Sequence, residues 1–195
     1  MRSDEYYNKY SGILNDLTRA FHDVFLLKTI EEVQSKNELD NSLRSFPVMN
    51  HFCELAKADL GLTIYKILFD NSKPTTNTIK HFNSTGKKLG SQKNVKFNLS
   101  KETENLEVPL KSLRDTYLAH SDVNSTEAIV ETVDLINATY EILDLINKMA
   151  DNNIDDRVNP VTQNALLKIE HDFIAGTKLL MNTIIKKENG DNKNV

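Results

Sequence analysis

The sequence has few of the residues on which disulfide-rich, zinc-binding and many-stranded folds depend. Its 195 residues include one cysteine, Cys53, which excludes a disulfide framework and a cysteine-rich zinc site. Cys53 lies in an apolar helical stretch, and we interpret it as a small buried side chain rather than a nucleophile. Six glycines and four prolines are too few for a sandwich or barrel, which needs frequent turns. A chain of this length can bury a core unaided, so we expect one domain over residues 1–195.

Long apolar runs and an apolar leader are also missing. No stretch reaches the roughly 18 apolar residues that a membrane-spanning helix needs. Residues 1–5 are polar and acidic and lack the apolar core of a secretory signal. The sequence therefore predicts a cytoplasmic protein with no membrane partner.

Acidic residues are absent from one segment of an otherwise acidic chain. Residues 71–100 hold six of the 24 basic residues and none of the 28 acidic ones, although the net charge is −4. The six are Lys73, Lys80, Lys87, Lys88, Lys93 and Lys96. Such asymmetry is a reason to consider an anionic partner, and a solvated lysine-rich loop is the alternative. Gly86 and Gly90 interrupt the helical pattern, so we expect a loop over residues 84–100.

The hydrophobic pattern is helical almost throughout. It predicts helices over about residues 4–35, 46–69, 109–119, 124–150 and 159–187, and a short helix near residue 80 capped by Thr76 or Asn77. We therefore predict an all-helical, up-and-down bundle of four or five long helices, with a frayed tail from residue 188.

Particular packing expectations follow from this pattern. The buried stripe expected on the helix over 124–150 is Ile129, Val133, Ile136, Tyr140, Leu143 and Ile146. The stripe expected on the last helix is Leu166, Ile169, Phe173, Leu180 and Ile184. Gly61 costs its helix about 1 kcal/mol relative to alanine, which a close helix crossing would offset, and we expect Gly176 to allow close packing as well. Asp59, in an apolar helix, is a paired structural carboxylate, a carboxylate that faces solvent on the polar edge of the helix, or a support for an active site.

One short segment combines residue types that carry chemistry. Residues 110–122 read LKSLRDTYLAHSD and place Arg114, Asp115, His120 and Asp122 at the end of a predicted helix. Arginine binds a phosphate through two parallel N–H groups, and histidine exchanges protons near neutral pH. Such a pair suffices in principle for metal-free RNA cleavage, in which His120 would move a proton and Arg114 would stabilise charge on the phosphate. Asp115 would orient either residue or tune its pKa.

Helix geometry limits how this pair can act. Six residues of α-helix rise about 9 Å and turn about 240°, so Arg114 and His120 do not share a face of a straight helix. They converge if the helix ends or kinks before His120, or if two subunits of a dimer pool their residues. The structural alternative is that His120 opposes the helix dipole and Arg114 pairs with a carboxylate.

Residues 113–122 resemble the signature of HEPN domains, which is an arginine followed by a polar residue and, a few residues later, a histidine. The fuller pattern is similar to the AbiU-type branch of abortive-infection proteins. The resemblance extends weakly over residues 5–185 and is specific only in residues 114–122. It implies a helical bundle that dimerises with its arginine–histidine motifs at the interface. Arg114 and His120 would be its catalytic pair and Asp115 the supporting polar residue.

The resemblance also implies a function. Many relatives are metal-independent ribonucleases that act as toxins or in phage defence, whereas others are inactive binding or assembly modules. Asp122 stands where some HEPN toxins carry a tyrosine that is nucleotidylated, so regulation by that route is not expected.

We therefore expect a metal-independent endoribonuclease of the toxin or abortive-infection type, without a cofactor. Its partners would be RNA, a second copy of the chain with Arg114 and His120 near the interface, and an antitoxin protein. The residues expected to bind RNA are Lys87, Lys88, Lys93 and Lys96. The alternatives are a non-catalytic HEPN module that holds a partner protein or RNA, and an unrelated helical bundle. His22, His51, His81 and His171 lack the one-turn spacing of a helical metal pair, so no metal site is expected.

Overall fold

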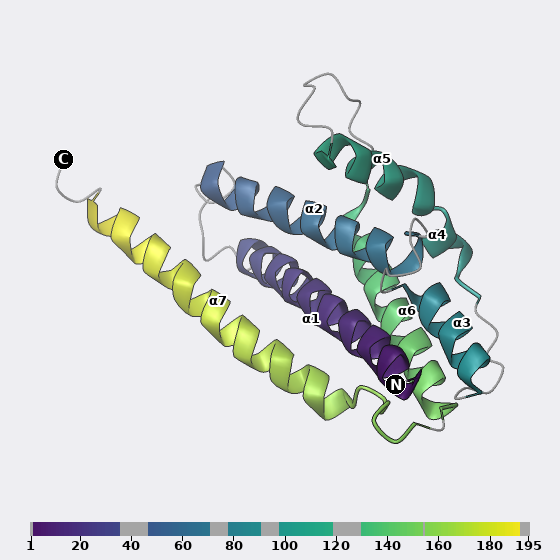
Figure 1. Cartoon of the computed structure of the whole chain (residues 1–195). Coiled ribbons are helices and arrows are strands. Elements are labelled where there is room, and N and C mark those ends of the chain that lie inside the picture. The colour runs from purple at the N-terminus through teal and green to yellow at the C-terminus, as the bar shows by residue number, and fades with distance from the viewer. Residues whose placement is uncertain are drawn as a thin grey trace. The chain divides into compact units, whose positions relative to one another are not determined.

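The computed structural model describes residues 2–35, 47–70, 78–90, 98–118, 130–153 and 155–191, and every regular element in these ranges is a helix (Figure 1). The helices are α1 (Arg2–Ser35), α2 (Pro47–Leu68), α3 (Ile79–Leu89), α4 (Lys101–Glu104), α5 (Glu107–Leu118), α6 (Thr132–Asp151) and α7 (Gln163–Asp191). The predicted all-helical class is confirmed. None of the described helices is both long and apolar enough to cross a membrane.

The helices form two compact units. Unit 1 takes in Met1–Phe21 and Lys57–Val161, and unit 2 takes in His22–Ala56 and Thr162–Val195. The long helices α1 and α2 therefore contribute residues to both units. The expectation of a single domain over residues 1–195 stays a prediction.

The core of unit 1 is built on one apolar face of α1, a helix that the sequence predicted over about residues 4–35. The buried apolar residues of α1 in this unit are Tyr6, Tyr10, Ile13, Leu17, Ala20 and Phe21. The ring of Tyr6 stacks on Phe82 of α3 with centroids 4.5 Å apart, and Phe21 meets Tyr140 of α6 edge to face at 5.4 Å. The first half of α1 thus holds α3 and α6 through aromatic contacts.

Two ion pairs join α1 to α2 within unit 1. Arg19 binds both carboxylate oxygens of Asp59, with its Nε donating at 2.6 Å, and Lys66 donates to Asp16 at 2.8 Å. The later residue of α1 pairs with the earlier residue of α2, so the two helices run antiparallel. Asp59 is therefore a paired structural carboxylate, one of the roles that the sequence left open.

The α3 region corrects the loop that we expected over residues 84–100. Thr78 caps α3 by accepting the His81 backbone N–H at 3.1 Å, and the helix continues through the buried Gly86 to Leu89. Gly90 ends it in the left-handed region, with φ 66°, where glycine lacks the Cβ penalty of other residues. The expected caps Thr76 and Asn77 lie outside the described residues.

A second correction concerns the residue at which α6 begins and the residues that it buries. We expected a helix from about residue 124, but residues 130 and 131 are not helical and α6 begins at Thr132. Val133 is 59% exposed, although it was expected in the core. The buried face consists of Leu135, Ala138, Thr139, Ile142, Leu145, Ile146, Met149 and Ala150. The later members of the predicted stripe do contribute to the core: Ile136, Tyr140 and Leu143 are half-buried, Ile146 is fully buried, and Tyr140 contacts Phe21 of α1. Ile129 lies outside the described residues.

The short helix α4 was not predicted, and it is tied to α6 by one carboxylate. Glu141 accepts hydrogen bonds from the Ser100 backbone N–H at 2.6 Å, from the Ser100 hydroxyl at 2.7 Å and from the Thr103 hydroxyl. Burial by itself would raise the pKa of Glu141, but these hydrogen bonds outweigh it and lower the pKa below its usual value. The chain that enters α5 is thereby fixed to α6.

In unit 2, contacts join the second half of α1 to α7. His22 stacks on Phe173 with centroids 5.1 Å apart, and Lys178 pairs with Glu32 at 3.1 Å. Three residues of the expected α7 stripe are half-buried, namely Leu166, Ile169 and Phe173. The side chains of Leu180 and Ile184 lie outside the described residues.

Three smaller expectations about unit 2 were wrong. Gly176 does not mediate close packing, because a Cβ there would meet nothing within 4 Å. The helix α7 begins at Gln163 after the cap residue Thr162, later than the expected start at residue 159, and it runs to Asp191, past the expected end at residue 187. Cys53 is half-buried rather than buried.

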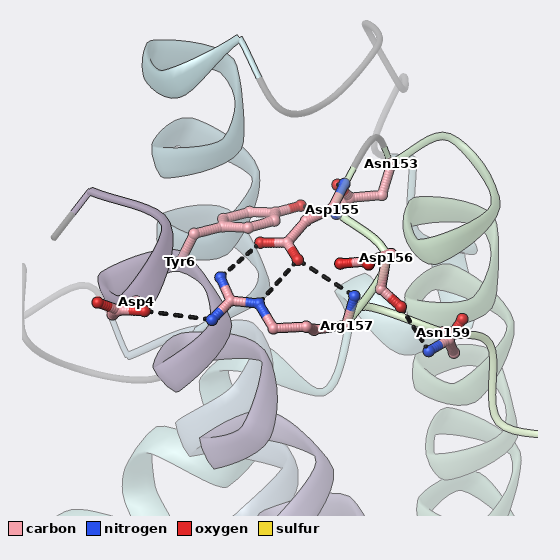
Figure 2. Close-up of polar contacts among 7 residues, drawn as sticks. All are labelled: Asp4, Tyr6, Asn153, Asp155, Asp156, Arg157 and Asn159. Atoms are coloured by element: carbon pink, nitrogen blue, oxygen red, sulfur yellow. Dashed lines mark hydrogen bonds and ion pairs between the residues drawn. The ribbon is translucent and has the colours of Figure 1, made fainter.

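An arginine-centred network ties the start of α1 to the segment after α6 in unit 1 (Figure 2). Arg157 donates to Asp155 through Nε at 3.0 Å and Nη2 at 2.9 Å, and to Asp4 through Nη1 at 3.2 Å. Its guanidinium lies 5.0 Å from the ring centroid of Tyr7. Hydrogen bonding to Arg157 lowers the pKa of both Asp155 and Asp4, so both carboxylates stay ionised well into the acid range.

This network predicts an acid-dependent contribution to stability. A carboxylate with a depressed pKa stabilises the fold above its unfolded pKa, about 3.9 for aspartate, and loses that contribution as pH falls through the folded pKa. Arg157→Gln should therefore lower Tm at pH 7, and the difference from wild type should shrink between pH 4 and pH 2, which thermal melts at each pH would measure. A Tm difference that stays constant over this range would show that the ionised carboxylates of Asp155 and Asp4 do not stabilise the fold through Arg157.

Candidate functional site

The helix that carries the motif is anchored at its beginning by buried leucines. Leu106, immediately before α5, is 6% exposed, and Leu110 is fully buried. Pro109 falls in the first turn of α5, where the missing N–H and fixed φ of proline are tolerated. The helix begins at Glu107, slightly before the expected Pro109, and an acidic residue in the first turn suits the helix dipole.

A close crossing between α2 and α5 sets the position of the motif. A Cβ built on Gly61 would lie 2.8 Å from Leu113 Cδ2 and 3.1 Å from Leu110 Cδ2. These separations are shorter than van der Waals contact, so a Cβ at this position would have to push aside the ends of the Leu113 and Leu110 side chains. The predicted close crossing at Gly61 is confirmed. One turn further along α2, Tyr65 faces the same helix.

Arg114 is held by two residues from two helices. Its Nε and Nη2 donate to Asp115 Oδ1 at 2.9 and 2.6 Å, and its Nη1 donates to the Tyr65 hydroxyl at 3.0 Å. The guanidinium carbon also lies 4.7 Å from the centroid of the Tyr65 ring, within the range of a cation–π contact. Asp115, which the sequence assigned either to Arg114 or to His120, contacts Arg114.

The Arg114 side chain remains accessible and charged. It is 28% exposed. The hydrogen bond to Asp115 raises the pKa of Arg114, partial burial opposes this, and Tyr65 and Asp70 add to the increase. Three of the five N–H groups of a guanidinium are used by the hydrogen bonds to Asp115 and Tyr65, which leaves one N–H on each Nη nitrogen. Such a group can bind an anionic oxygen.

The remaining residues of the predicted site are only partly within the described chain. His120, Asp122, Lys93 and Lys96 lie outside the described residues, so their roles stay predictions. Lys87 and Lys88 are exposed in the last turn of α3, where positive charge opposes the helix dipole. Figure 1 shows α3 and α5 as separate helices of unit 1, with α4 between them. Neither Lys87 nor Lys88 joins the cluster around Arg114.

Tyr65 is the site residue that sequence reasoning missed. It lies in the apolar stretch of α2 and is 7% exposed, so the pattern assigned it to the core. Asp70, which directly follows that stretch, acts on Arg114 through its charge. A tyrosine in a buried run can signal a polar partner, because its hydroxyl seeks a hydrogen bond, but the sequence does not say which residue supplies it.

Nothing in the described part of the chain points to a metal centre. No group of three or more His, Cys, Asp and Glu side chains there is placed to hold an ion. The chemistry available from the described site is therefore that of a positioned guanidinium with a carboxylate and a phenol hydroxyl beside it.

The crossing at Gly61 predicts opposite effects for the same substitution at two glycines. Gly176→Ala should raise stability by up to ~1 kcal/mol, because alanine is the better helix former and its Cβ meets no atom. Gly61→Ala should instead lower stability by up to about 2 kcal/mol, because overpacking against Leu113 and the buried Leu110 costs about 1–3 kcal/mol and the better helix propensity of alanine offsets about 1 kcal/mol of that. Chemical unfolding of both variants would measure this. Stabilisation by Gly61→Ala equal to that by Gly176→Ala would show that α2 and α5 do not cross closely.

Comparisons with protein-family models, with curated proteins and with solved structures found no match to this chain. The site is therefore defined by two features of the molecule itself. One is the order of Arg114, Asp115 and His120 in the sequence, and the other is the way Asp115 and Tyr65 hold the Arg114 guanidinium.

Proposed function

We propose that this protein is a metal-independent endoribonuclease of the toxin or abortive-infection type, in which Arg114 and His120 act on one RNA phosphodiester. The observation that carries the proposal is the state of Arg114: partly exposed, fixed by Asp115 and Tyr65, and left with an N–H on each Nη nitrogen. The resemblance of residues 113–122 to the HEPN signature supports the same assignment.

The proposed reaction needs two proton transfers and one site of charge stabilisation. The ribose 2′-oxygen loses its proton and attacks phosphorus, the bond from phosphorus to the 5′-oxygen breaks, and the leaving oxygen gains a proton. His120 carries one of these transfers, and water or the His120 of a second copy carries the other. The remaining N–H groups of Arg114 bind the non-bridging oxygens as charge accumulates there. The products are a 2′,3′-cyclic phosphate and a 5′-hydroxyl.

The exposure of Arg114 favours ligand binding over a purely structural role. Its carboxylate partner Asp115 is the next residue on the same helix and is 55% exposed. An ion pair so accessible to solvent contributes at most about 1 kcal/mol to stability. Loss of Arg114 would therefore leave no buried charge without a partner, in contrast to the penalty for breaking a buried pair.

A non-catalytic module that holds a partner protein is the second candidate. Val108 on α5 is 77% exposed and Val133 on α6 is 59% exposed, and both belong to unit 1. Exposed apolar side chains of this kind suit a protein interface, although single ones are common on any surface. This candidate differs from the nuclease in requiring no activity from Arg114 or His120.

Cleavage of RNA by purified protein in EDTA separates these candidates. Wild type should cut RNA with EDTA present, and both Arg114→Ala and His120→Ala should reduce the rate by at least about 100-fold, as removal of an acid–base or charge-stabilising group does. Arg114→Ala should also keep a Tm within a few degrees of wild type, because the exposed pair adds little stability. Gel analysis of a fluorescent RNA gives the rates, and thermal melts give Tm.

The control for this experiment is Lys148→Gln, which removes an exposed positive charge on α6 without touching the motif. It should cleave RNA at the wild-type rate. Equal rates for wild type, Arg114→Ala and His120→Ala would exclude the proposed mechanism. A large loss of Tm in Arg114→Ala would support the structural role instead.

The basic residues of α3 give a further prediction. Replacing Lys87 and Lys88 together with glutamine should weaken RNA binding more at low salt than at high salt. The slope of log K against log salt concentration should fall by about 1.4, since each phosphate contact with single-stranded RNA contributes about 0.7. The matched control replaces the exposed Lys148 and Lys168, which changes the net charge equally. Fluorescence anisotropy over a salt series measures the RNA affinity of both double variants. Identical slopes for the two would show that α3 is not part of the RNA-binding surface.

A further inference from the structure

Tyr65 makes two kinds of contact with one guanidinium. Its hydroxyl accepts an N–H bond from Arg114 at 3.0 Å, and its ring lies beneath the guanidinium carbon at 4.7 Å from the centroid. The side chain is 7% exposed and belongs to the most apolar stretch of α2. The hydroxyl therefore occupies a place that is fixed by the core of unit 1.

Asp115 alone would not give Arg114 a fixed position. It is the neighbouring residue on α5 and is 55% exposed, so its carboxylate is surrounded largely by water. Both of its hydrogen bonds run to the same oxygen, Oδ1, from Nε and Nη2. Tyr65 binds the opposite nitrogen, Nη1, from a different helix. The two partners together restrict both translation and rotation of the guanidinium plane.

From this geometry we propose that Tyr65 is a positioning residue that orients Arg114 to bind the scissile RNA phosphate. The inference rests on the proposed ribonuclease function and adds a residue on α2 to a site otherwise confined to residues 114–122. Arginine has a long, flexible stem, and its restriction before substrate binds avoids an entropic cost during the reaction. The Gly61 crossing serves the same end, because it brings α5 close enough for Arg114 to reach the hydroxyl.

The variant that tests this inference is Tyr65→Phe, which keeps the buried ring and the cation–π face and removes only the hydroxyl. The kcat for RNA cleavage should fall about tenfold while KM stays within about twofold, because a misoriented Arg114 loses interactions made in the transition state. Tm should change little. Tyr7→Phe is the matched control, since its ring also lies beneath a guanidinium, that of Arg157 at 5.0 Å, and the described Arg157 bonds run to aspartates. It should leave kcat unchanged.

A second readout does not depend on catalysis. In wild type, the two Nη nitrogens of Arg114 should give separate NMR signals, because the hydrogen bonds to Tyr65 and Asp115 hinder rotation of the guanidinium. In Tyr65→Phe these signals should merge as rotation becomes faster. Arg114→Lys assigns them by their disappearance.

The outcomes distinguish failure of the positioning role of Tyr65 from failure of the proposed ribonuclease function. Lower kcat together with merged Nη signals supports both. Unchanged Nη signals or unchanged kcat in Tyr65→Phe overturns the positioning role while the nuclease stands. Wild-type protein that fails to cleave RNA overturns the proposed function and, with it, the catalytic meaning of Tyr65, even if the NMR difference is seen.

Discussion

The arrangement of the candidate site depends on the approach of α5 to α2 at Gly61. A single absent Cβ lets Leu110 and Leu113 pack against the backbone of α2. That approach places Tyr65, buried in α2, under Arg114, which is partly exposed on α5. The helix-propensity cost of glycine is thus offset by packing, and the same packing brings a fixed hydroxyl to a charged side chain. Stability and site geometry are coupled through one contact between two helices.

Much of the fold could be predicted from the hydrophobic pattern, and the predictions that were wrong have physical causes. The helices expected over about residues 4–35 and 46–69 match α1 and α2 to within two residues at each end, because both segments carry apolar residues at helical spacing over their whole length. On α6 the prediction was wrong at Val133, which lies exposed in the first turn, whereas Ile146 of the same stripe is fully buried and Tyr140 packs on Phe21 of α1. Periodicity does not show where along a helix the core ends. At Gly86 the chain stays helical, since a buried glycine inside a helix costs stability without ending it.

The candidate site could be predicted only in part. The order of Arg114 and Asp115 in the sequence suggested a phosphate-binding arginine with a supporting carboxylate, and the geometry agrees with that pairing. Tyr65 lies 49 positions away along the chain, and nothing local to α2 or α5 shows that the two helices meet there. Gly61 indicated that another helix comes close to α2, but the same reasoning was wrong for Gly176, and it did not name the partner helix. Long-range contacts of this kind depend on the packing of the whole unit.

The central claim is that Arg114 and His120 cut RNA without a metal. The most direct measurement is the mapping of RNA 5′ ends in cells that express either wild type or His120→Ala at equal soluble levels. The account predicts growth arrest and new fragments with 5′-hydroxyl ends in cells with wild type, and neither in cells with His120→Ala. Intact RNA and normal growth with wild-type protein, or identical fragments with both proteins, would contradict it.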